Sequence, residues 1–158
     1  MPTDDLMARI LDELGDSAEL DGALPIEIIH RLVDADENTG PMTITELAEL
    51  LELSPHTLRY YERAGLVQVA RDPAGHRVYD SDAQRRLVFI TRMRLSGMPM
   101  RDLQRYIELV DQGDDSVPER LDMLVEHRDT IRRQRRELTL SLAATEYKIL
   151  TYGGRTGA

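Results

Sequence analysis

Apolar residues in the last third of the chain recur at alternating spacings of three and four positions, from Leu121 to Tyr152. Over about four and a half heptads, this pattern predicts a coiled-coil helix about 50 Å long, because an α-helix rises 1.5 Å per residue. Such a helix would leave its apolar stripe in water. We therefore expect residues 113–152 to pair with a second copy, and residues 153–158 to form a flexible tail. The predicted dimerisation residues are Leu121, Leu124, Arg128, Ile131, Leu138, Leu142 and Ile149.

Two arginines, Arg128 and Arg135, occupy positions of this predicted seam. Polar groups at such positions lower stability but fix the register and the number of helices. Alternatively, the guanidinium groups extend past the seam to solvent or to an acid such as Glu126. The pattern leaves both interpretations open.

Shorter helical patterns lie between residues 42 and 112. Thr43, with Glu46 three residues later, is typical of a capping box, and Leu47, Leu50 and Leu51 supply an apolar face. Ser54 is a favourable N-cap for a second helix that begins at Pro55 and ends near Arg63, before Ala64 and Gly65. Two short helices joined by a tight turn predict a helix-turn-helix.

The segment after the second helix favours a β-hairpin wing. Residues 66–69 have strand character, residues 72–75 are typical of a turn, and residues 77–79 can return as a second strand. Ser81 with Gln84 predicts the start of a further helix that Gly97 ends, and another helix follows from Met100 to about Val110. Ser116 with Glu119 predicts the cap of the long final helix.

Residues 1–41 are predicted to form a helical extension that ends in a polar linker. Apolar residues recur at helical spacing in 4–14 and 24–34. The extension holds eleven Asp and Glu against two Arg, a balance of 2 − 11 = −9, which equals the net charge of the whole chain. Three roles stay open: solvating the protein or packing in a dimer, contacting RNA polymerase, or folding back over a basic surface and competing with DNA.

The rest of the chain is neutral overall, but its charge is unevenly distributed. Residues 54–105 contain ten Arg against five acids. A basic surface of this kind favours a nucleic-acid partner, which the negative total would otherwise argue against.

Composition excludes several kinds of chemistry. The chain has no Cys, so disulfides, zinc–thiolate sites, iron–sulfur clusters and thiol sensing are excluded. No apolar run approaches the roughly 20 residues of a membrane helix, and the acidic start does not resemble a secretory signal. We therefore expect a cytoplasmic protein. The dispersed histidines suggest no metal site, and no nucleophile-and-base arrangement suggests an enzyme or a cofactor.

The second helix and the wing carry the candidate DNA contacts. We expect Leu58 to face the core, with Thr57, Arg59, Tyr60 and Tyr61 on the exposed side. Arginine can present a planar donor fork to guanine or phosphate, and tyrosine hydroxyls can donate to phosphate. His56 either touches phosphate or is solvated. The predicted DNA-binding residues are Thr43, His56, Thr57, Arg59, Tyr60, Tyr61, Arg63, His76, Arg77 and Tyr79.

The segment SPHTLRYYERAGLV, followed by GHRVYDSDAQRRLVFITRMRLSGMPMRDL, resembles the MerR family of bacterial transcription regulators. The resemblance covers residues 42–109 and extends in kind to the C-terminal helix. It implies a winged helix-turn-helix that dimerises through an antiparallel coiled coil and binds double-stranded, pseudo-palindromic promoter DNA. Regulators of this kind bend and untwist the promoter so that RNA polymerase meets both promoter elements.

By position, the resemblance places Thr57 and Arg59 near bases or adjacent phosphates, and Tyr60 and Tyr61 at the groove wall. It places Arg77 and Tyr79 at the wing phosphates. Residues 113–120 are similar to a G-D-x-S/T-x-x-x-R element of the subgroup that contains thiol-dependent aldehyde and electrophile sensors. Their reactive cysteine is absent here, so that sensing chemistry does not transfer.

The predicted fold is mainly α: a winged helix-turn-helix over 42–112, a dimerisation helix over 113–152 and a helical N-terminal extension. Four methionines, including Met93 and Met123, either line a pocket for an unidentified small-molecule effector or fill the core. Two rival interpretations are an architectural or excision-type DNA binder and a coiled-coil interaction module.

Overall fold

The computed structural model describes residues 40–156 of the 158-residue chain, so the predicted helical extension lies outside the described residues. The chain divides into two units, one ending at Ile107 and one beginning at Glu108. This division falls inside a helix, five residues before the domain boundary expected at residue 112.

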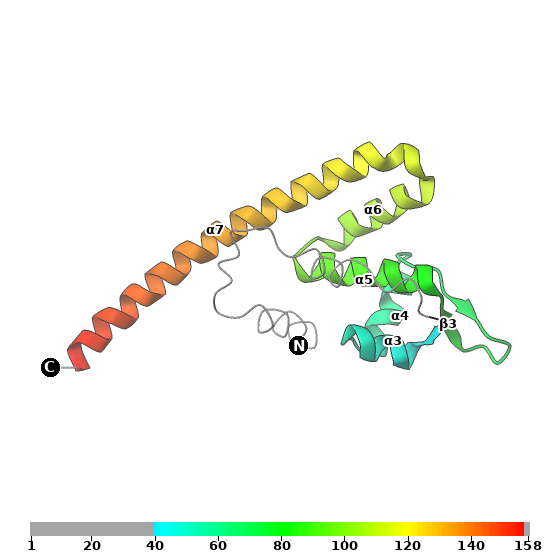
Figure 1. Cartoon of the computed structure of the whole chain (residues 1–158), viewed down its shortest axis with the longest axis horizontal. Helices are drawn as coiled ribbons and strands as arrows, with labels where there is room; N and C mark the ends of the chain where they lie inside the picture. Colours follow the sequence, from blue (N-terminus) through cyan, green and yellow to red (C-terminus); the bar gives the residue numbers. More distant parts are fainter. Residues whose placement is uncertain (1–39, 157–158) are drawn as a thin grey trace. The chain divides into compact units, whose positions relative to one another are not determined.

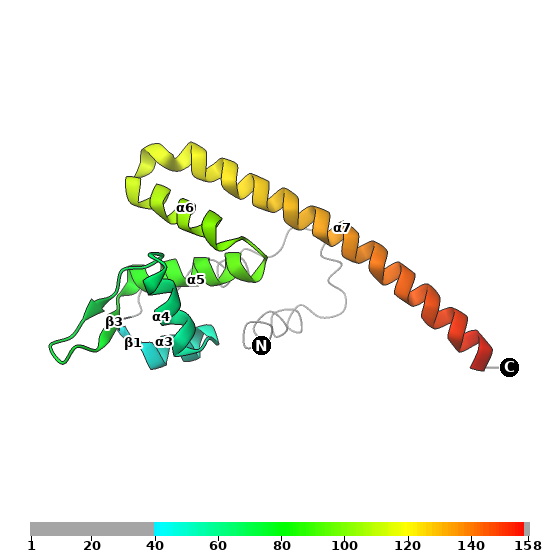
Figure 2. The ribbon, with the colours of Figure 1, turned by 180° about the vertical axis from the view of Figure 1, so that it is seen from behind.

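The first unit begins with a short strand and the two helices of a helix-turn-helix. Strand β1 spans Met42–Thr43, α3 spans Ile44–Leu51 and α4 spans Pro55–Arg63. Figures 1 and 2 show α3 and α4 next to each other. The Thr43 hydroxyl accepts a hydrogen bond from the Glu46 amide at 3.2 Å, and the Ser54 hydroxyl accepts one from the Thr57 amide at 3.1 Å. Both predicted N-caps are therefore confirmed.

The turn between α3 and α4 depends on a residue with a left-handed backbone. Glu52 has φ 55° and closes α3, while the amide of Leu53 donates to the Ala48 carbonyl at 2.9 Å. A non-glycine residue rarely adopts this conformation. Here the hydrogen bonds from the turn satisfy the last carbonyls of α3, which would otherwise be without partners.

The wing is a three-stranded antiparallel sheet in the order β1-β3-β2. Strand β2 spans Ala70–Arg71 and β3 spans Arg77–Tyr79. The strand predicted at 66–69 is wrong, because the tertiary packing buries Leu66 and Val67 in the core and pairing begins only at Ala70. Strand β1 was not predicted; its two residues pair with Tyr79 and Val78 of β3.

Two further helices follow, α5 over Ser81–Leu95 and α6 over Met100–Gln112. The cap of α5 is Asp80 and not Ser81, since the Asp80 carboxylate accepts from the Ala83 amide at 2.8 Å. Gln84 instead lies fully buried, and its side-chain amide donates to the carbonyls of Gly40 and Tyr79 at 3.0 Å each. Gln84 therefore ties α5 to the segment just before β1 and to the end of β3, which lie at the same end of the β1–β3 pairing.

The core of the first unit is made of residues from every helix and from β3. Side chains at helical spacing meet there, and the buried aliphatic residues interlock with the ring of Tyr79. On its edge, Phe89 of α5 stacks with Tyr106 of α6 at 4.8 Å between ring centroids. The fully buried leucine and isoleucine side chains of the core are Leu47, Leu58, Leu66, Leu87, Ile90 and Leu103.

The second unit contains the end of α6, a short 3₁₀ turn η1 over Asp114–Ser116 and the long helix α7 over Val117–Thr156. The long helix is confirmed, but it passes through residues 153–156, where a flexible tail was predicted. Residues 157–158 are outside the described part. Figures 1 and 2 show α7 as a single unbroken helix.

Ser116 joins α6 to α7 in a way that differs from its predicted role as a cap for Glu119. Its hydroxyl lies 2.5 Å from the Leu109 carbonyl and 2.7 Å from the Gly113 carbonyl, and accepts from Arg120 Nε at 3.0 Å. Arg120 also donates to the Gly113 carbonyl at 3.4 Å. The chain turns between α6 and α7 at Gly113, whose φ of 96° is accessible because glycine has no Cβ. The Gly–Asp–x–Ser–x–x–x–Arg element is therefore a structural link.

Candidate nucleic-acid interface

The recognition helix α4 presents one polar face and one buried face. Leu58 is fully buried as predicted, whereas His56 and Arg63 are exposed and Thr57 and Arg59 are half-buried. The Thr57 hydroxyl lies 3.0 Å from that of Ser54, so the cap orients the first turn. Tyr60 is 44% exposed and continues the polar face.

Tyr61 does not lie on this exposed face, which corrects the prediction made for it. Its side chain is only 6% exposed and packs in the core. Burial raises the pKa of the Tyr61 hydroxyl, and the charge of Arg94 with its hydrogen bond opposes the rise. Arg94 also donates to the Met98 carbonyl at 3.0 Å. Tyr61 therefore connects α4 to the end of α5 inside the unit.

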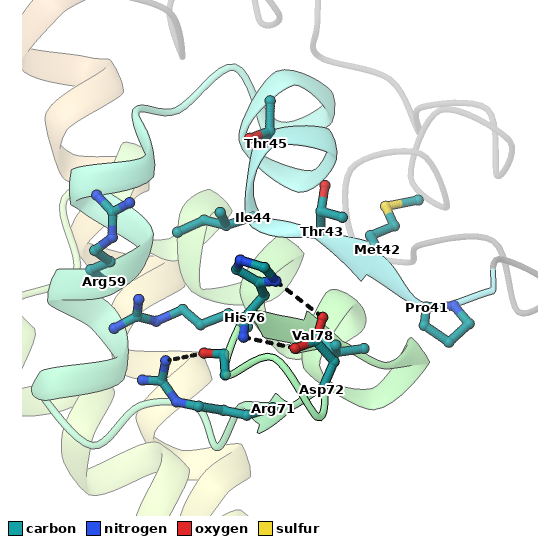
Figure 3. Close-up of a pocket in the computed structure, with 12 residues that line it drawn as sticks. Pro41, Met42, Thr43, Ile44, Thr45, Arg59, Arg71, Asp72, His76 and Val78 are labelled. Carbon is teal, nitrogen blue, oxygen red and sulfur yellow. Dashed lines mark hydrogen bonds and ion pairs between the residues drawn. The ribbon is translucent and has the colours of Figure 1, made fainter.

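A hollow of about 560 Å³ opens between the start of α3, one side of α4 and the wing. Figure 3 shows that Arg59 from α4, Arg71 from β2 and His76 from the wing turn project toward the same space. Thr43 and Thr45 line its other side. The hollow brings together hydroxyls and guanidinium groups, which are donors suited to an anionic ligand such as a phosphate.

Glu62 of α4 holds two wing arginines at the edge of this hollow. Arg77 Nε donates to the Glu62 carboxylate at 2.6 Å, and Arg71 Nη2 lies 3.9 Å from its other oxygen. The hydrogen bond that Arg77 donates to Glu62 raises the pKa of Arg77 above its ordinary value. Arg71 and Arg77 face each other directly across the β2–β3 ladder, where like charges repel. Glu62 neutralises part of that repulsion and fixes the wing against α4.

The wing turn is held by a second carboxylate. The Asp72 side chain accepts from the amides of His76 at 2.8 Å and Ala74 at 3.0 Å, and Arg71 Nη1 donates to the Gly75 carbonyl at 3.0 Å. The hydrogen bond from the His76 amide, with smaller contributions from the His76 ring, lowers the pKa of Asp72. Gly75 has φ 85°, as the turn requires. The tip is thus ordered before any ligand arrives.

Tyr79 is likewise not an exposed wing contact. It is fully buried, and within residues 40–156 its hydroxyl has no hydrogen-bond partner. Burial raises the pKa of Tyr79, and the nearby negative charge of Glu62 raises it further. The prediction for Tyr79 was wrong because adjacent residues of a strand point to opposite faces of the sheet. The face of β3 that carries Tyr79 meets the core.

The structure thus brings four of the ten predicted DNA-binding residues to the hollow: Thr43, Arg59, His76 and Arg77. Four others lie on α4 outside the hollow: His56, Thr57, Tyr60 and Arg63. The remaining two, Tyr61 and Tyr79, are in the core. Sequence reasoning missed Arg71 and Glu62. The hairpin register pairs Arg71 with Arg77. A strand correctly predicted to begin at Ala70 would therefore have placed Arg71 opposite Arg77 and identified it as a candidate.

In the part of the chain that the structure describes, no three His, Asp or Glu side chains gather as metal ligands would. Among the same residues, no helix combines the length and apolar character needed to cross a bilayer.

A recognition helix flanked by a basic wing defines a winged helix-turn-helix protein. Residues 42–109 match the MerR HTH family regulatory proteins, and residues 84–144 match the MerR DNA-binding family. An HTH-type transcriptional regulator of Haemophilus influenzae is 32% identical over 111 residues, which cover 70% of this chain and 82% of that protein. The chain belongs to the MerR family and is a DNA-binding transcriptional regulator.

Two further relatives agree with this assignment. The regulator AdhR of Bacillus subtilis is 36% identical over 91 residues, covering 57% of this chain and 65% of AdhR. The structure is similar to that of HiNmlR, a MerR family regulator lacking the sensor domain, bound to promoter DNA, with a TM-score of 0.68 and 29% identity. That similarity covers 75% of this chain and 94% of HiNmlR.

Proposed function

We propose that this regulator binds a pseudo-palindromic promoter as a homodimer, with the polar face of α4 in the major groove and the hollow on the adjoining phosphates. The convergence of Arg59, Arg71 and His76 on one hollow carries the proposal. An arginine fork matches the oxygens of a phosphate or the edge of a guanine, and the half-sites would lie one helical turn, about 34 Å, apart.

Different residues serve different parts of this recognition. Arg59, at the boundary of α4 and the hollow, contacts a base edge or the phosphate beside it, with His56, Thr57, Tyr60 and Arg63 along the groove. Arg71 and Arg77 contact backbone phosphate, and Glu62 holds them in place. Phosphate contacts set the register, whereas base contacts select the sequence.

The dimer is formed by the apolar seam of α7 in an antiparallel coiled coil. Leu138, Leu142 and Ile149 are 58–69% exposed in the single chain. Their burial against a second copy removes them from water and sets the spacing of the two recognition helices. The dimer then acts in the cytoplasm, without catalysis, by bending promoter DNA for RNA polymerase, at a deformation cost of about 1–6 kcal/mol that the phosphate contacts offset.

Arg59→Ala tests the proposal on DNA from the region upstream of the protein's own gene, by fluorescence anisotropy at fixed salt. We expect affinity to fall by about 10- to 100-fold, because one arginine contact to a base contributes about 1–3 kcal/mol. Arg71→Ala should weaken binding to all sequences alike and reduce the salt slope by about 1.

Arg101→Ala is the matched control, since Arg101 is 88% exposed in the same unit and does not line the hollow. It should leave affinity unchanged. If Arg59→Ala binds its upstream DNA as tightly as the unmodified protein does, the assignment of this site to DNA is wrong.

A further inference from the structure

An arginine cluster lies in the middle of α7, and only two of its members, Arg128 and Arg135, belong to the predicted dimer seam. Five of the nine residues from 128 to 136 are arginine, and Asp129 is the one acid among them. All five arginines are exposed; Arg128 and Arg133 have 52% and 63% of their side chains accessible. This arginine cluster is the most basic stretch of the second unit.

The α-helix sets these charges against one another. Arg128, Arg132 and Arg136 are one turn apart, and like charges at this spacing destabilise a helix. Asp129 lies 3.0 Å from Arg128, and Glu137 lies 3.9 Å from Arg133. Within residues 40–156, no carboxylate lies within ion-pair distance of Arg132 or Arg136. Among the described residues, two of the five arginine charges are therefore left without an ion pair.

The proposed dimer would intensify this repulsion. When two identical helices pair antiparallel, only the segment at the two-fold axis meets its own copy. With the ends of Val117–Thr156 matched, that segment is the middle of α7, next to the arginine cluster. With Arg128, Ile131, Arg135 and Leu138 at the seam, helical spacing puts Arg132 beside the seam and Arg136 farther from it, so both stay accessible after dimerisation. Two copies of the arginine cluster then form one continuous cationic surface.

The complementary charge is present in the same chain. Residues 1–39 hold eleven acids against Arg9 and Arg31, whereas residues 42–158 are neutral in total. The segment precedes both family matches, which begin at residues 42 and 84. Fully extended, 39 residues span about 130 Å, and a 40-residue helix is about 60 Å long. The segment is therefore long enough to reach the arginine cluster from its attachment at Gly40.

We propose that the acidic segment 1–39 docks on the arginine cluster of dimerised α7. The basic surface of the first unit is the alternative docking site, but acids of the same unit already neutralise part of its charge. Glu62 forms ion pairs with Arg71 and Arg77, and Asp82 forms one with Arg85. The segment thereby covers the cationic surface at the dimer axis and leaves the DNA-binding hollow open. This inference rests on the homodimer of the proposed function.

Carbodiimide cross-linking of the full-length protein without DNA tests the docking. The reagent joins carboxylates in contact with amines, and the sequence has one lysine, Lys148. Arg132→Lys and Arg136→Lys keep the charge and add a reactive amine, while Arg63→Lys is the matched control on the exposed face of α4. We expect peptides linking Lys at 132 or 136 to acids of residues 1–39, at several-fold higher yield than with Arg63→Lys.

Salt gives a second measurement on the same variants. At 1 M salt the screening length is about 3 Å, so these cross-links should disappear. Cross-links chiefly to the Arg63→Lys amine would overturn the proposal in favour of competition with DNA. No cross-links at either place, in a sample that sediments as a dimer, would overturn it as well. A monomeric sample would instead contradict the proposed function, so the two failures can be told apart.

Discussion

The two units of this protein solve the burial of apolar surface in opposite ways. The first unit closes a core of its own, in which Leu58, Leu87 and Leu103 are fully buried. The second unit exposes 69% of Leu138 and 72% of Leu140 on a single helix. The difference teaches that the DNA-reading surface can be ordered within one copy, whereas the long helix requires a second chain to cover its stripe.

The largest effect is expected from breaking the seam of α7. Leu138→Asp with Leu142→Asp removes four apolar side chains from each dimer, and burying each is worth about 1.5–3 kcal/mol. Sedimentation should show monomers at micromolar concentration, with loss of high-affinity promoter binding.

Leu140→Asp is the control for this variant. In the single chain Leu140 is as exposed as Leu138, but helical spacing places it on the face opposite the seam. It should leave the dimer intact. Equal dissociation by both variants would show that the seam is not where the two copies meet.

A smaller, local effect is expected at Glu62 in the first unit. Glu62→Gln removes the charge that neutralises Arg71 and Arg77, and a hydrogen bond to a charged group contributes about 1.5–3 kcal/mol. Because the pair is partly exposed, we expect the free energy of unfolding to fall by about 1 kcal/mol. DNA affinity should fall several-fold.

Simple electrostatics predicts the opposite sign, since losing an acid near phosphates would tighten binding. Anisotropy at two salt concentrations separates the two effects. Tighter binding by Glu62→Gln would mean that Glu62 repels DNA and does not position the wing. The dimer should persist in either case, because Glu62 is outside the second unit.

The start of the second unit should respond to Ser116→Ala. This change removes the hydroxyl that contacts the Leu109 and Gly113 carbonyls and accepts from Arg120, so we expect a loss of about 1 kcal/mol in unfolding free energy. Thermal denaturation measures it. Ser116→Thr keeps the hydroxyl and should retain the free energy of unfolding. If Ser116→Thr lowers that free energy as much as Ser116→Ala does, loss of the hydrogen bonds is not the cause of the destabilisation.

The smallest effect is expected at Tyr79. A buried hydroxyl without a partner costs free energy, so Tyr79→Phe should leave stability unchanged or raise it slightly, with DNA affinity unaltered. Thermal denaturation and anisotropy are the measurements. A clear loss of affinity would restore Tyr79 as a phosphate contact.

Local sequence signals predicted much of this fold correctly. The caps at Thr43 and Ser54, the end of α4 near Gly65 and the long α7 depend on contacts between residues a few positions apart, which a sequence pattern records. The errors arose where distant residues decide. The strand expected at 66–69 is replaced by pairing at Ala70–Arg71, because burial of Leu66 and Val67 takes precedence over strand propensity.

The candidate site divides in the same way. That α4 and the wing would carry an arginine-rich surface followed from residue types and the helix-turn-helix pattern. The pattern did not show which side chains take part. Tyr61 and Tyr79 turn into the core, while Glu62 and Arg71 enter the site from a helix and from a strand that the sequence pattern misplaced. The sequence by itself determined the helices, their order and the basic character of the surface, because these depend on local spacing and composition. Only the tertiary structure decided which arginines converge on the hollow, because that convergence depends on packing between α4 and the wing.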